Sequence, residues 1–134
     1  MSLSLFVHGT PAPQGSKRHV GGGRLVESSK NLPAWRAAVT EHFRAAWGGC
    51  PPLDGPVSVA LRVYLPRPGR TRFRDYPAGP PDLDKLQRAV GDALTASGVI
   101  RDDARIVHWN ASKLWHSETP PGAHITITEM EDAK

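Results

Sequence analysis

Four aspartates bracket one amphipathic segment of the sequence, in two close pairs. Asp82 and Asp84 are one residue apart within PPDLDKL, and Asp102 and Asp103 are adjacent after GVIR. A residue that precedes a proline is pushed away from helical backbone angles, so we expect an extended approach to Asp82. Residues i and i+2 of an extended segment point the same way. The spacing therefore predicts that the Asp82 and Asp84 carboxylates face one side, with Leu83 turned into the core.

The second aspartate pair follows the segment at the point where the chain turns back. A strand that begins at Ala104 could lie beside the segment that carries Asp82, which would bring the two pairs together. Carboxylates that lie close together raise one another's pKa unless a cation sits between them. Hard oxygen ligands suit Mg²⁺, with Mn²⁺ as a substitute. The constellation therefore indicates a divalent metal site.

Each pair also has an explanation that involves no metal. Asp84 could cap a helix, because Asp is a favoured N-cap and Gln87 three residues later completes a pattern like a capping box. Asp102 and Asp103 could serve a turn. Capping leaves Asp82 without a role. Other metal motifs fit less well, since DLDKLQ breaks the EF-hand pattern and the six histidines are scattered without close pairing.

Two basic side chains, Lys85 and Arg88, follow the first pair. Arg88 lies four residues beyond Asp84, so a helix would place both on one face. Arg88 could pair with Asp84 or Asp92, or it could contact a phosphate bound beside a metal. Lys85 opposes the helix dipole, which favours acids at a helix start. Its presence there is consistent with an anionic ligand.

Positive charge is concentrated in two segments rich in glycine and proline. The chain has a net charge of +4 and a pI of about 9.6, a balance that suits a polyanionic partner. The segments are PRPGRTRFRD and GSKRHVGGGR, and their cations are Arg67, Arg70, Arg72, Arg74, Lys17, Arg18 and Arg24. Flexible cationic loops suit contacts with a phosphate backbone. The alternative for either segment is a solvated surface loop.

The hydrophobic pattern supplies the elements that would position these residues. Helical spacing of apolar residues predicts one helix from Asn31 to Gly48-Gly49, and a second that carries Leu83 to Leu94 on one face and stops at Gly98. A loop is expected at TPAPQGSKRHVGGG. Alternation and apolar composition predict strands over residues 3–7, 24–27, 56–65, 104–115 and 123–129.

These elements predict an α+β fold in which a mixed β-sheet packs two helices on one face. At 134 residues the chain is expected to form a single domain, residues 1–134, with its own core. Its single cysteine, Cys50, excludes an intrachain disulfide, and no apolar run approaches the length of a membrane span. The start of the chain lacks the features of a signal peptide. We therefore expect a cytoplasmic protein with no membrane partner.

The segment DLDKLQRAVGDAL…SGVIRDDARIV resembles the RusA family of Holliday junction resolvases, small metal-dependent endonucleases of bacteria and phages. The motif covers about a fifth of the chain. Weaker agreement extends to PAPQGSKR, to the segment around Trp35, to the strand before the arginines and to the terminal ITITE. The resemblance implies a RusA-like α+β fold and a homodimer. Two matched nicks in a four-way junction call for two active sites related by a two-fold axis.

The resemblance also implies roles for individual residues. It implies that Asp82, Asp84 and Asp103 are the Mg²⁺-binding catalytic acids, with Asp102 beside them. The family's helical lysine falls on Arg88, which keeps the positive charge but not the compact ammonium group. Where the family form has asparagine after the D-x-D, this chain has Lys85. These two departures affect phosphate contact more than the chemistry.

The expected activity is hydrolysis of phosphodiester bonds in four-way DNA junctions during DNA recombination and repair, with Mg²⁺ and no small-molecule cofactor. A metal held by the aspartates would polarise a phosphate oxygen and acidify a bound water. Arg88 or Lys85 would neutralise the scissile phosphate, and the two basic segments, with Lys17 and Arg18 in one of them, would hold the flanking backbone whatever its sequence.

Three alternatives stay open at this stage. The first is a basic DNA-binding protein that does no chemistry, its aspartates serving only as caps and turns. The second is a metal hydrolase that acts on another branched DNA. The third is a hydrolase or transferase of a small phosphorylated substrate, which the presence of two long basic loops argues against.

Overall fold

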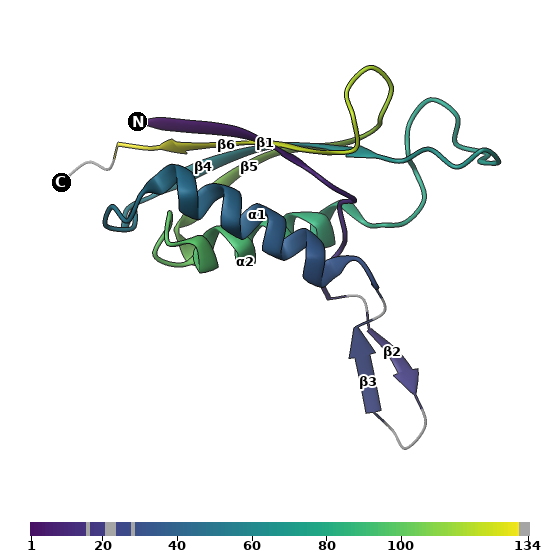
Figure 1. Cartoon of the computed structure of the whole chain (residues 1–134), viewed down its shortest axis with the longest axis horizontal. Helices are drawn as coiled ribbons and strands as arrows, with labels where there is room; N and C mark the ends of the chain where they lie inside the picture. The colour runs from purple at the N-terminus through teal and green to yellow at the C-terminus, as the bar shows by residue number, and fades with distance from the viewer. Residues whose placement is uncertain (16, 21–23, 28, 132–134) are drawn as a thin grey trace.

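A four-stranded sheet forms one layer of the molecule (Figure 1). The structure is a computed structural model that describes residues 1–15, 17–20, 24–27 and 29–131. The strands lie in the order β1 (Ser2–His8), β6 (Gly122–Glu129), β4 (Val57–Leu65) and β5 (Ile106–Trp115). β6 pairs antiparallel with both β1 and β4, whereas β4 and β5 are parallel. The sheet is therefore mixed, as the sequence predicts.

The inner face of the sheet is made by alternate residues of its central strands. Antiparallel pairing sets Leu61 of β4 opposite Ile125 of β6, and both side chains are fully buried. The outer face carries Arg62, whose guanidinium donates hydrogen bonds to Asn110 of β5. The period-two pattern of the sequence sets which face packs the core. The buried side chains of β4 are Val57, Val59, Leu61, Val63 and Leu65.

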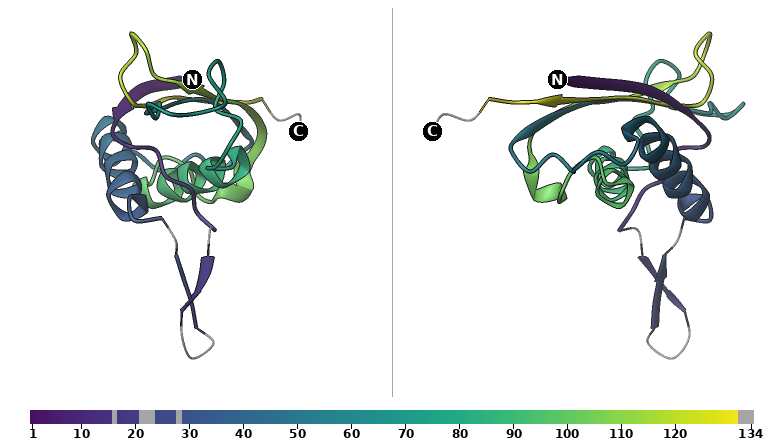
Figure 2. Two further views of the ribbon diagram at one scale, coloured as in Figure 1. Left: turned by 90° about the vertical axis from the view of Figure 1, so that its right-hand side faces the viewer. Right: turned by 60° about the vertical axis from the view of Figure 1, so that its left-hand side comes forward.

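Both long helices pack on that inner face (Figures 1 and 2). α1 (Leu32–Trp47) ends at Gly48 and α2 (Leu83–Ser97) ends at Gly98, with left-handed φ angles of 66° and 86° that glycine adopts without a Cβ clash. The predicted α+β class, with two helices on one face of a mixed sheet, is confirmed. No helix in the described ranges is both long and apolar enough to cross a membrane. The buried apolar side chains of the helices are Leu32, Trp35, Val39, Phe43, Leu86, Ala89, Val90, Ala93 and Leu94.

β2 (Lys17–Val20) and β3 (Arg24–Glu27) form a separate two-stranded antiparallel sheet. This hairpin projects away from the body formed by the larger sheet and the two helices (Figure 2). The predicted strand at 24–27 is confirmed, but the predicted loop before it is wrong where β2 stands. Four residues with two adjacent cations show no apolar alternation, so only their pairing with β3 identifies this strand. The side chains of both strands, including those of Lys17 and Arg18, lie outside the described part of the chain.

The parallel pair of β4 and β5 requires a crossover connection, and α2 lies within it. The chain leaves β4, passes through the arginine loop (residues 66–81), runs along α2 and returns through one turn of 3-10 helix, η1 (Asp103–Arg105). The sequence predicts strand from residue 104, but β5 begins at residue 106 because η1 occupies the first positions. One β–α–β unit therefore carries both aspartate pairs.

Candidate active site

A pocket of about 240 Å³ lies between α2 and the start of β5. Residues 84, 87, 88 and 91 of α2 have the three- and four-residue spacing that places side chains on one helix face. The pocket combines two carboxylates, a guanidinium and an amide with an apolar wall. Its lining residues are Asp84, Gln87, Arg88, Gly91, Asp103, Ile106 and Trp109.

The first aspartate pair straddles the start of α2. Asp82 is the N-cap, with extended backbone at φ −70° and ψ 140°, and its carbonyl oxygen accepts a hydrogen bond from the Leu86 N–H at 3.1 Å. Asp84 already lies in the first helical turn. The prediction that both residues are extended is therefore wrong, and so is the alternative in which Asp84 is the N-cap. The prolines extend the chain only up to Asp82, and the helix dipole favours an acid in the first turn.

Arg88 is an exposed cation on the pocket. None of the residues that the structure describes forms an ion pair with it, so the alternative pairing with Asp84 or Asp92 is not observed. Its guanidinium lies against the backbone of Gly15, where a Cβ would come within 2.7 Å of Arg88 Nη1. Gln14, the preceding residue, donates its backbone N–H to the Lys85 carbonyl oxygen at 3.0 Å. The loop before β2 therefore docks on the first turns of α2, next to the pocket.

Asp103 faces α2 from the turn that precedes β5. The neighbouring Arg105 ties this turn to the rest of the protein, because its guanidinium donates to Asp54 Oδ1 at 2.9 Å. A hydrogen bond with the Asp102 side chain, partial burial, and the negative charges of Asp102 and Asp92 raise the pKa of Asp103 above its ordinary value. Acidic groups therefore crowd together at this place, and a cation would relieve their repulsion.

Gly91 leaves the space at the bottom of the pocket open. A Cβ built there would lie 3.7 Å from Asp103 Cβ and 3.8 Å from both Ile106 Cδ1 and Trp109 Cζ2. A glycine in a helix interior costs about 0.5–1 kcal/mol relative to alanine, so its place in α2 calls for a local reason. The pocket is such a reason. Sequence reasoning missed Gly91, Ile106 and Trp109 as pocket residues, although a glycine in the middle of an amphipathic helix was an available signal.

Asp82 and Lys85 lie beside the pocket and not in its lining. Lys85 Nζ is 3.7 Å from Asp82 Oδ2, and the Asp82 side chain is 60% exposed. The structure thus brings Asp84, Arg88 and Asp103 together in one pocket. It places Asp82 next to this group, at the start of α2, where it is paired with a lysine.

Lys113 of β5 anchors the chain immediately before Asp82. Its half-buried Nζ donates hydrogen bonds to the carbonyl oxygens of Gly79 at 2.7 Å and Pro81 at 2.8 Å. Sequence reasoning missed this residue. The available signal was a lone cation inside an otherwise uncharged strand, because a partly buried ammonium group must find acceptors.

The carboxylates of the pocket suit a hard divalent cation. Within the described ranges, no three side chains of His, Cys, Asp or Glu are grouped closely enough to hold a metal ion. Mg²⁺, however, is usually held in enzymes by one or two carboxylates, with water and substrate phosphate completing its coordination. Asp84 and Asp103 supply two carboxylates from different elements, and Asp102 and Asp92 add negative charge nearby. The donor set therefore fits the predicted cofactor.

The arginine loop presents its cations to solvent. Arg67 Nη1 donates to the Arg74 carbonyl oxygen at 3.4 Å, and the Arg72 guanidinium lies 4.7 Å from the centre of the Phe73 ring. Trp115 of β5 donates from Nε1 to the Phe73 carbonyl oxygen at 2.8 Å, which ties the loop to the sheet. All four arginines of the loop are exposed and form no ion pair with a described residue; they are Arg67, Arg70, Arg72 and Arg74.

The same loop exposes an aromatic side chain that the sequence pattern did not single out. Tyr76 is 70% exposed. It lines a hollow of about 470 Å³ together with Arg67, Arg74 and Trp115. Surfaces that bind nucleic acid strands combine cations with aromatic rings, because bases stack on the rings. The signal in the sequence was an aromatic residue two positions after the last arginine of the segment.

An α+β chain with an acidic pocket inside a β–α–β crossover, flanked by exposed arginines, has features that suit a nuclease. Comparison with known proteins identifies one family of nucleases. The family model Endodeoxyribonuclease RusA matches residues 8–128, a range that includes both helices and all the pocket residues. This chain belongs to the RusA endodeoxyribonuclease family.

Individual relatives agree with this assignment. Proteins named crossover junction endodeoxyribonuclease RusA, from Escherichia coli (strain K12) and Enterobacteria phage 82, are each 35% identical to the chain over 79 residues. Each match covers 58% of this chain and 56% of the relative, so the chain spans about half the length of these relatives. The uncharacterized protein YqaN of Bacillus subtilis (strain 168) is 26% identical over 144 residues, with 96% of both chains covered. The resemblance seen in the sequence is thus confirmed at the level of the family.

Proposed function

We propose that this chain is a metal-dependent endodeoxyribonuclease that resolves four-way DNA junctions by hydrolysing phosphodiester bonds. The observation that carries the proposal is the pocket shared by Asp84, Arg88 and Asp103 in a chain of the RusA family. Relatives of the chain bear the name crossover junction endodeoxyribonuclease. The biological setting of such an activity is DNA recombination and repair.

Mg²⁺ is the proposed cofactor, with Mn²⁺ as a substitute. Asp84 and Asp103 would hold the ion, with Asp82 as a further proposed ligand two residues before Asp84 and Asp102 directly before Asp103. When bound, such an ion supplies Lewis acidity toward a phosphate oxygen and lowers the pKa of a bound water. A hydrogen bond with the Asp102 side chain, burial, and the charges of Asp102 and Asp92 raise the pKa of Asp103. The crowding of these carboxylates supports the assignment, because a cation would offset their negative charge.

Arg88 is assigned to the scissile phosphate. Its guanidinium presents N–H donors in a planar fork that suits phosphate oxygens, and such charge-assisted hydrogen bonds stabilise the negative charge that develops in the transition state. The absence of a side chain on Gly15 leaves room for this guanidinium. Lys85, which lies near Asp82, would add positive charge for the flanking phosphate.

The two basic segments are assigned to the DNA backbone. The arginine loop ends at the start of α2, and the hairpin follows the loop that docks on the same helix. Exposed arginines without acidic partners among the described residues can contact phosphates directly. Such contacts position the duplex arms and carry no base sequence information. Lys17 and Arg18 are proposed to act in the same way from β2.

The proposed active form is a homodimer bound to branched DNA. Two matched cuts in a symmetric junction require two sites related by a two-fold axis. In the described sheet β5 is an edge strand that pairs with β4 on one side, and Val107 on this strand is 60% exposed. An exposed strand edge with an apolar side chain is a candidate surface for a second copy of the chain.

One assay tests the proposal. The purified protein is incubated with a synthetic four-way junction and with linear duplex of the same sequence, each with and without Mg²⁺. We expect paired nicks in the junction only when the metal is present. Binding without metal-dependent cutting would support the alternative of a DNA-binding protein that does no chemistry. Preferential cutting of flaps or forks would instead support a hydrolase of another branched DNA.

A further inference from the structure

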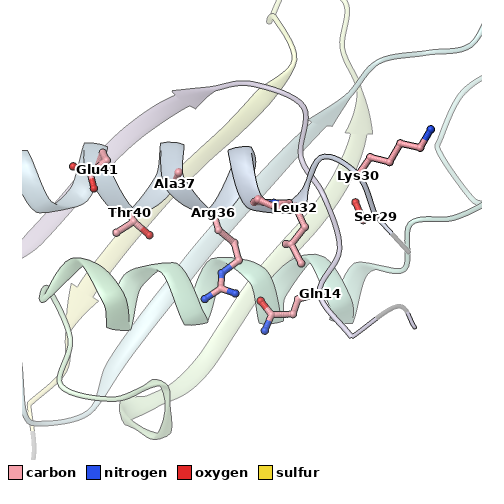
Figure 3. Close-up of a pocket in the computed structure, with 9 residues that line it drawn as sticks. Gln14, Ser29, Lys30, Leu32, Arg36, Ala37, Thr40 and Glu41 are labelled. Atoms are coloured by element: carbon pink, nitrogen blue, oxygen red, sulfur yellow. The ribbon is translucent and has the colours of Figure 1, made fainter. Parts of the chain in front are cut away.

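A second pocket, of about 660 Å³, is lined mainly by residues of α1. Figure 3 shows Arg36 and Gln14 reaching into the same space between α1 and α2, while Lys30 points away from α2. We call this space the Gln14 pocket. Its polar lining residues are Gln14, Ser29, Lys30, Arg36, Thr40 and Glu41.

A buried acceptor and a half-buried cation of the Gln14 pocket have no partner among the residues that the structure describes. The Oε1 atom of Gln14 is buried and accepts no hydrogen bond within the part of the chain that the structure describes. Arg36 is half-buried and forms no ion pair with any described residue. Buried polar groups in folded proteins are nearly always satisfied, so an orphaned acceptor beside an unpaired cation suggests a ligand that supplies what is missing.

Two further polar groups of the Gln14 pocket are engaged within the protein. Glu41 forms an ion pair with Arg44, which offsets its negative charge. The Thr40 hydroxyl donates to the Ala93 carbonyl oxygen of α2 at 3.4 Å. The ligand must therefore offer an anion to Arg36 and a hydrogen-bond donor to Gln14. A phosphodiester carries only acceptors, so it satisfies Arg36 but not the Gln14 oxygen. A nucleotide satisfies both, because the edges of the bases carry N–H donors.

The Gln14 pocket adjoins the candidate active site through two consecutive residues. Gln14 lines this pocket and is hydrogen-bonded through its backbone N–H to Lys85 of α2 at 3.0 Å. Gly15 lies against the guanidinium of Arg88, which lines the active-site pocket. A DNA strand whose scissile phosphate lies at Arg88 would therefore pass the Gln14 pocket with a nearby nucleotide.

We infer that the Gln14 pocket takes a nucleotide of the cleaved strand close to the scissile phosphate, with Arg36 on its phosphate and the Gln14 amide on its base edge. This inference rests on the proposed nuclease function and assigns the recognition of one base beside the cut to Gln14. Backbone contacts by the basic segments supply no such preference, so Gln14 is a specificity-determining residue.

The test uses junctions that carry each of the four bases at the positions flanking the cut. Wild type is expected to prefer one base at one position. Gln14→Leu keeps the size of the side chain and removes its hydrogen bonds, so it should reduce that preference by about tenfold while the junction is still cut at the same place. Arg36→Gln should weaken binding to all junctions alike. Arg62→Gln, on the outer face of the sheet, removes one charge away from both pockets and should change neither property.

A metal-free binding measurement separates this inference from the proposed function. In EDTA, an abasic residue at the preferred position should weaken wild-type binding and leave Gln14→Leu binding unchanged. If wild type binds but cuts no junction, the nuclease proposal fails while the binding result still decides the inference. Wild type without a base preference, or a Gln14→Leu variant that keeps the full preference and the abasic effect, would overturn the inference.

Discussion

Lys113 of β5 donates a hydrogen bond to the carbonyl oxygen of Pro81, the residue directly before Asp82. Its second bond, to Gly79, holds the end of the arginine loop from the same nitrogen. The start of α2 is therefore held by the strand that follows the helix. Asp82 and Asp84 thus depend on a residue that lies beyond both aspartate pairs in the sequence.

Replacing this lysine tests its positioning role. Lys113→Met keeps much of the side-chain length but removes the ammonium group, so we expect a loss of about 1–3 kcal/mol in the free energy of unfolding. Urea denaturation measures this loss. We also expect slower junction cleavage with nearly unchanged junction binding, because Asp82 and Asp84 lose their support. Lys113→Arg retains donors and should recover part of the activity; if Lys113→Met cleaves at the wild-type rate, the loop is held by other contacts.

The aspartates are predicted to act in catalysis and not in DNA binding. Asp82→Asn, Asp84→Asn and Asp103→Asn should each abolish metal-dependent cleavage while junction binding, measured by gel shift, stays intact. Each change removes a charged ligand and keeps the side-chain shape, and a lost anionic ligand lowers metal occupancy. Asp102→Asn should have a smaller effect.

Asp82 provides the sharpest comparison within this set, because it lies outside the pocket lining. Full activity of Asp82→Asn alone would restrict the metal site to Asp84 and Asp103. Full activity of Asp84→Asn would contradict the proposed metal site altogether.

The raised pKa of Asp103 predicts how stability depends on pH in the absence of metal. Its pKa is higher in the folded protein than in the unfolded chain, so the folded state binds the proton more tightly. The contribution of Asp103 to stability is therefore present at low pH and is lost as the pH rises through the folded-state pKa. Asp103→Asn should have a higher melting temperature than wild type at pH 7 in EDTA. The melting temperatures of the two proteins should converge as the pH falls toward 3.8, the ordinary pKa of an aspartate. An equal melting temperature of both proteins at pH 7 would argue against carboxylate crowding.

The arginine loop is predicted to hold the DNA backbone. Replacing Arg70, Arg72 and Arg74 with alanine should weaken binding to all DNA sequences alike. It should also reduce the slope of log affinity against log salt concentration by about 0.9 for each lost phosphate contact. The metal dependence and the position of the cut should not change. If the triple variant keeps the wild-type affinity and salt slope, the arginine loop does not contact the DNA backbone. Lys17 and Arg18 would then be the next residues to replace.

Gly91 allows the space requirement of the active-site pocket to be measured. In Gly91→Ala the new methyl group makes ordinary van der Waals contacts at 3.7–3.8 Å, so the fold should be retained. Loss of the helix-interior glycine should stabilise the protein by about 0.5–1 kcal/mol. Cleavage should nevertheless slow, and Gly91→Leu should abolish it by filling the pocket. A Gly91→Leu variant that folds and cleaves normally would show that the reaction takes place outside this pocket.

The core was more predictable from the sequence than the start of α2. Burial of one face requires period two in β4, so alternation alone identified all five of its buried residues. The backbone at Asp84 depends instead on contacts from distant segments. Lys113 holds the chain before the helix, and the Gln14 N–H bonds to the carbonyl oxygen of Lys85 within its first turn. Neither contact can be seen in local sequence propensities. The sequence pattern therefore predicted extended backbone as far as Asp84.

Part of the candidate site could be predicted because it lies within one helix. Asp84 and Arg88 share a face by their spacing alone. Gly91, Ile106 and Trp109 could not be assigned in the same way, since their role depends on how closely β5 approaches α2. The hairpin was predictable only in β3, because β2 has no apolar pattern of its own.

In the crossover from β4 to β5, α2 acts as a spacer of fixed length between Asp84 and Asp103. Asp84 and Asp103 stand at opposite ends of one continuous segment, and both are committed to the same pocket. Inserting one residue into α2 between them would rotate one end by about 100° relative to the other and turn Asp84 away from Asp103. The arginine loop lies before the helix, so its length can change without rotating Asp84 relative to Asp103. Related chains should therefore vary in the number of residues between β4 and Asp82 and keep a constant number between Asp84 and Asp103.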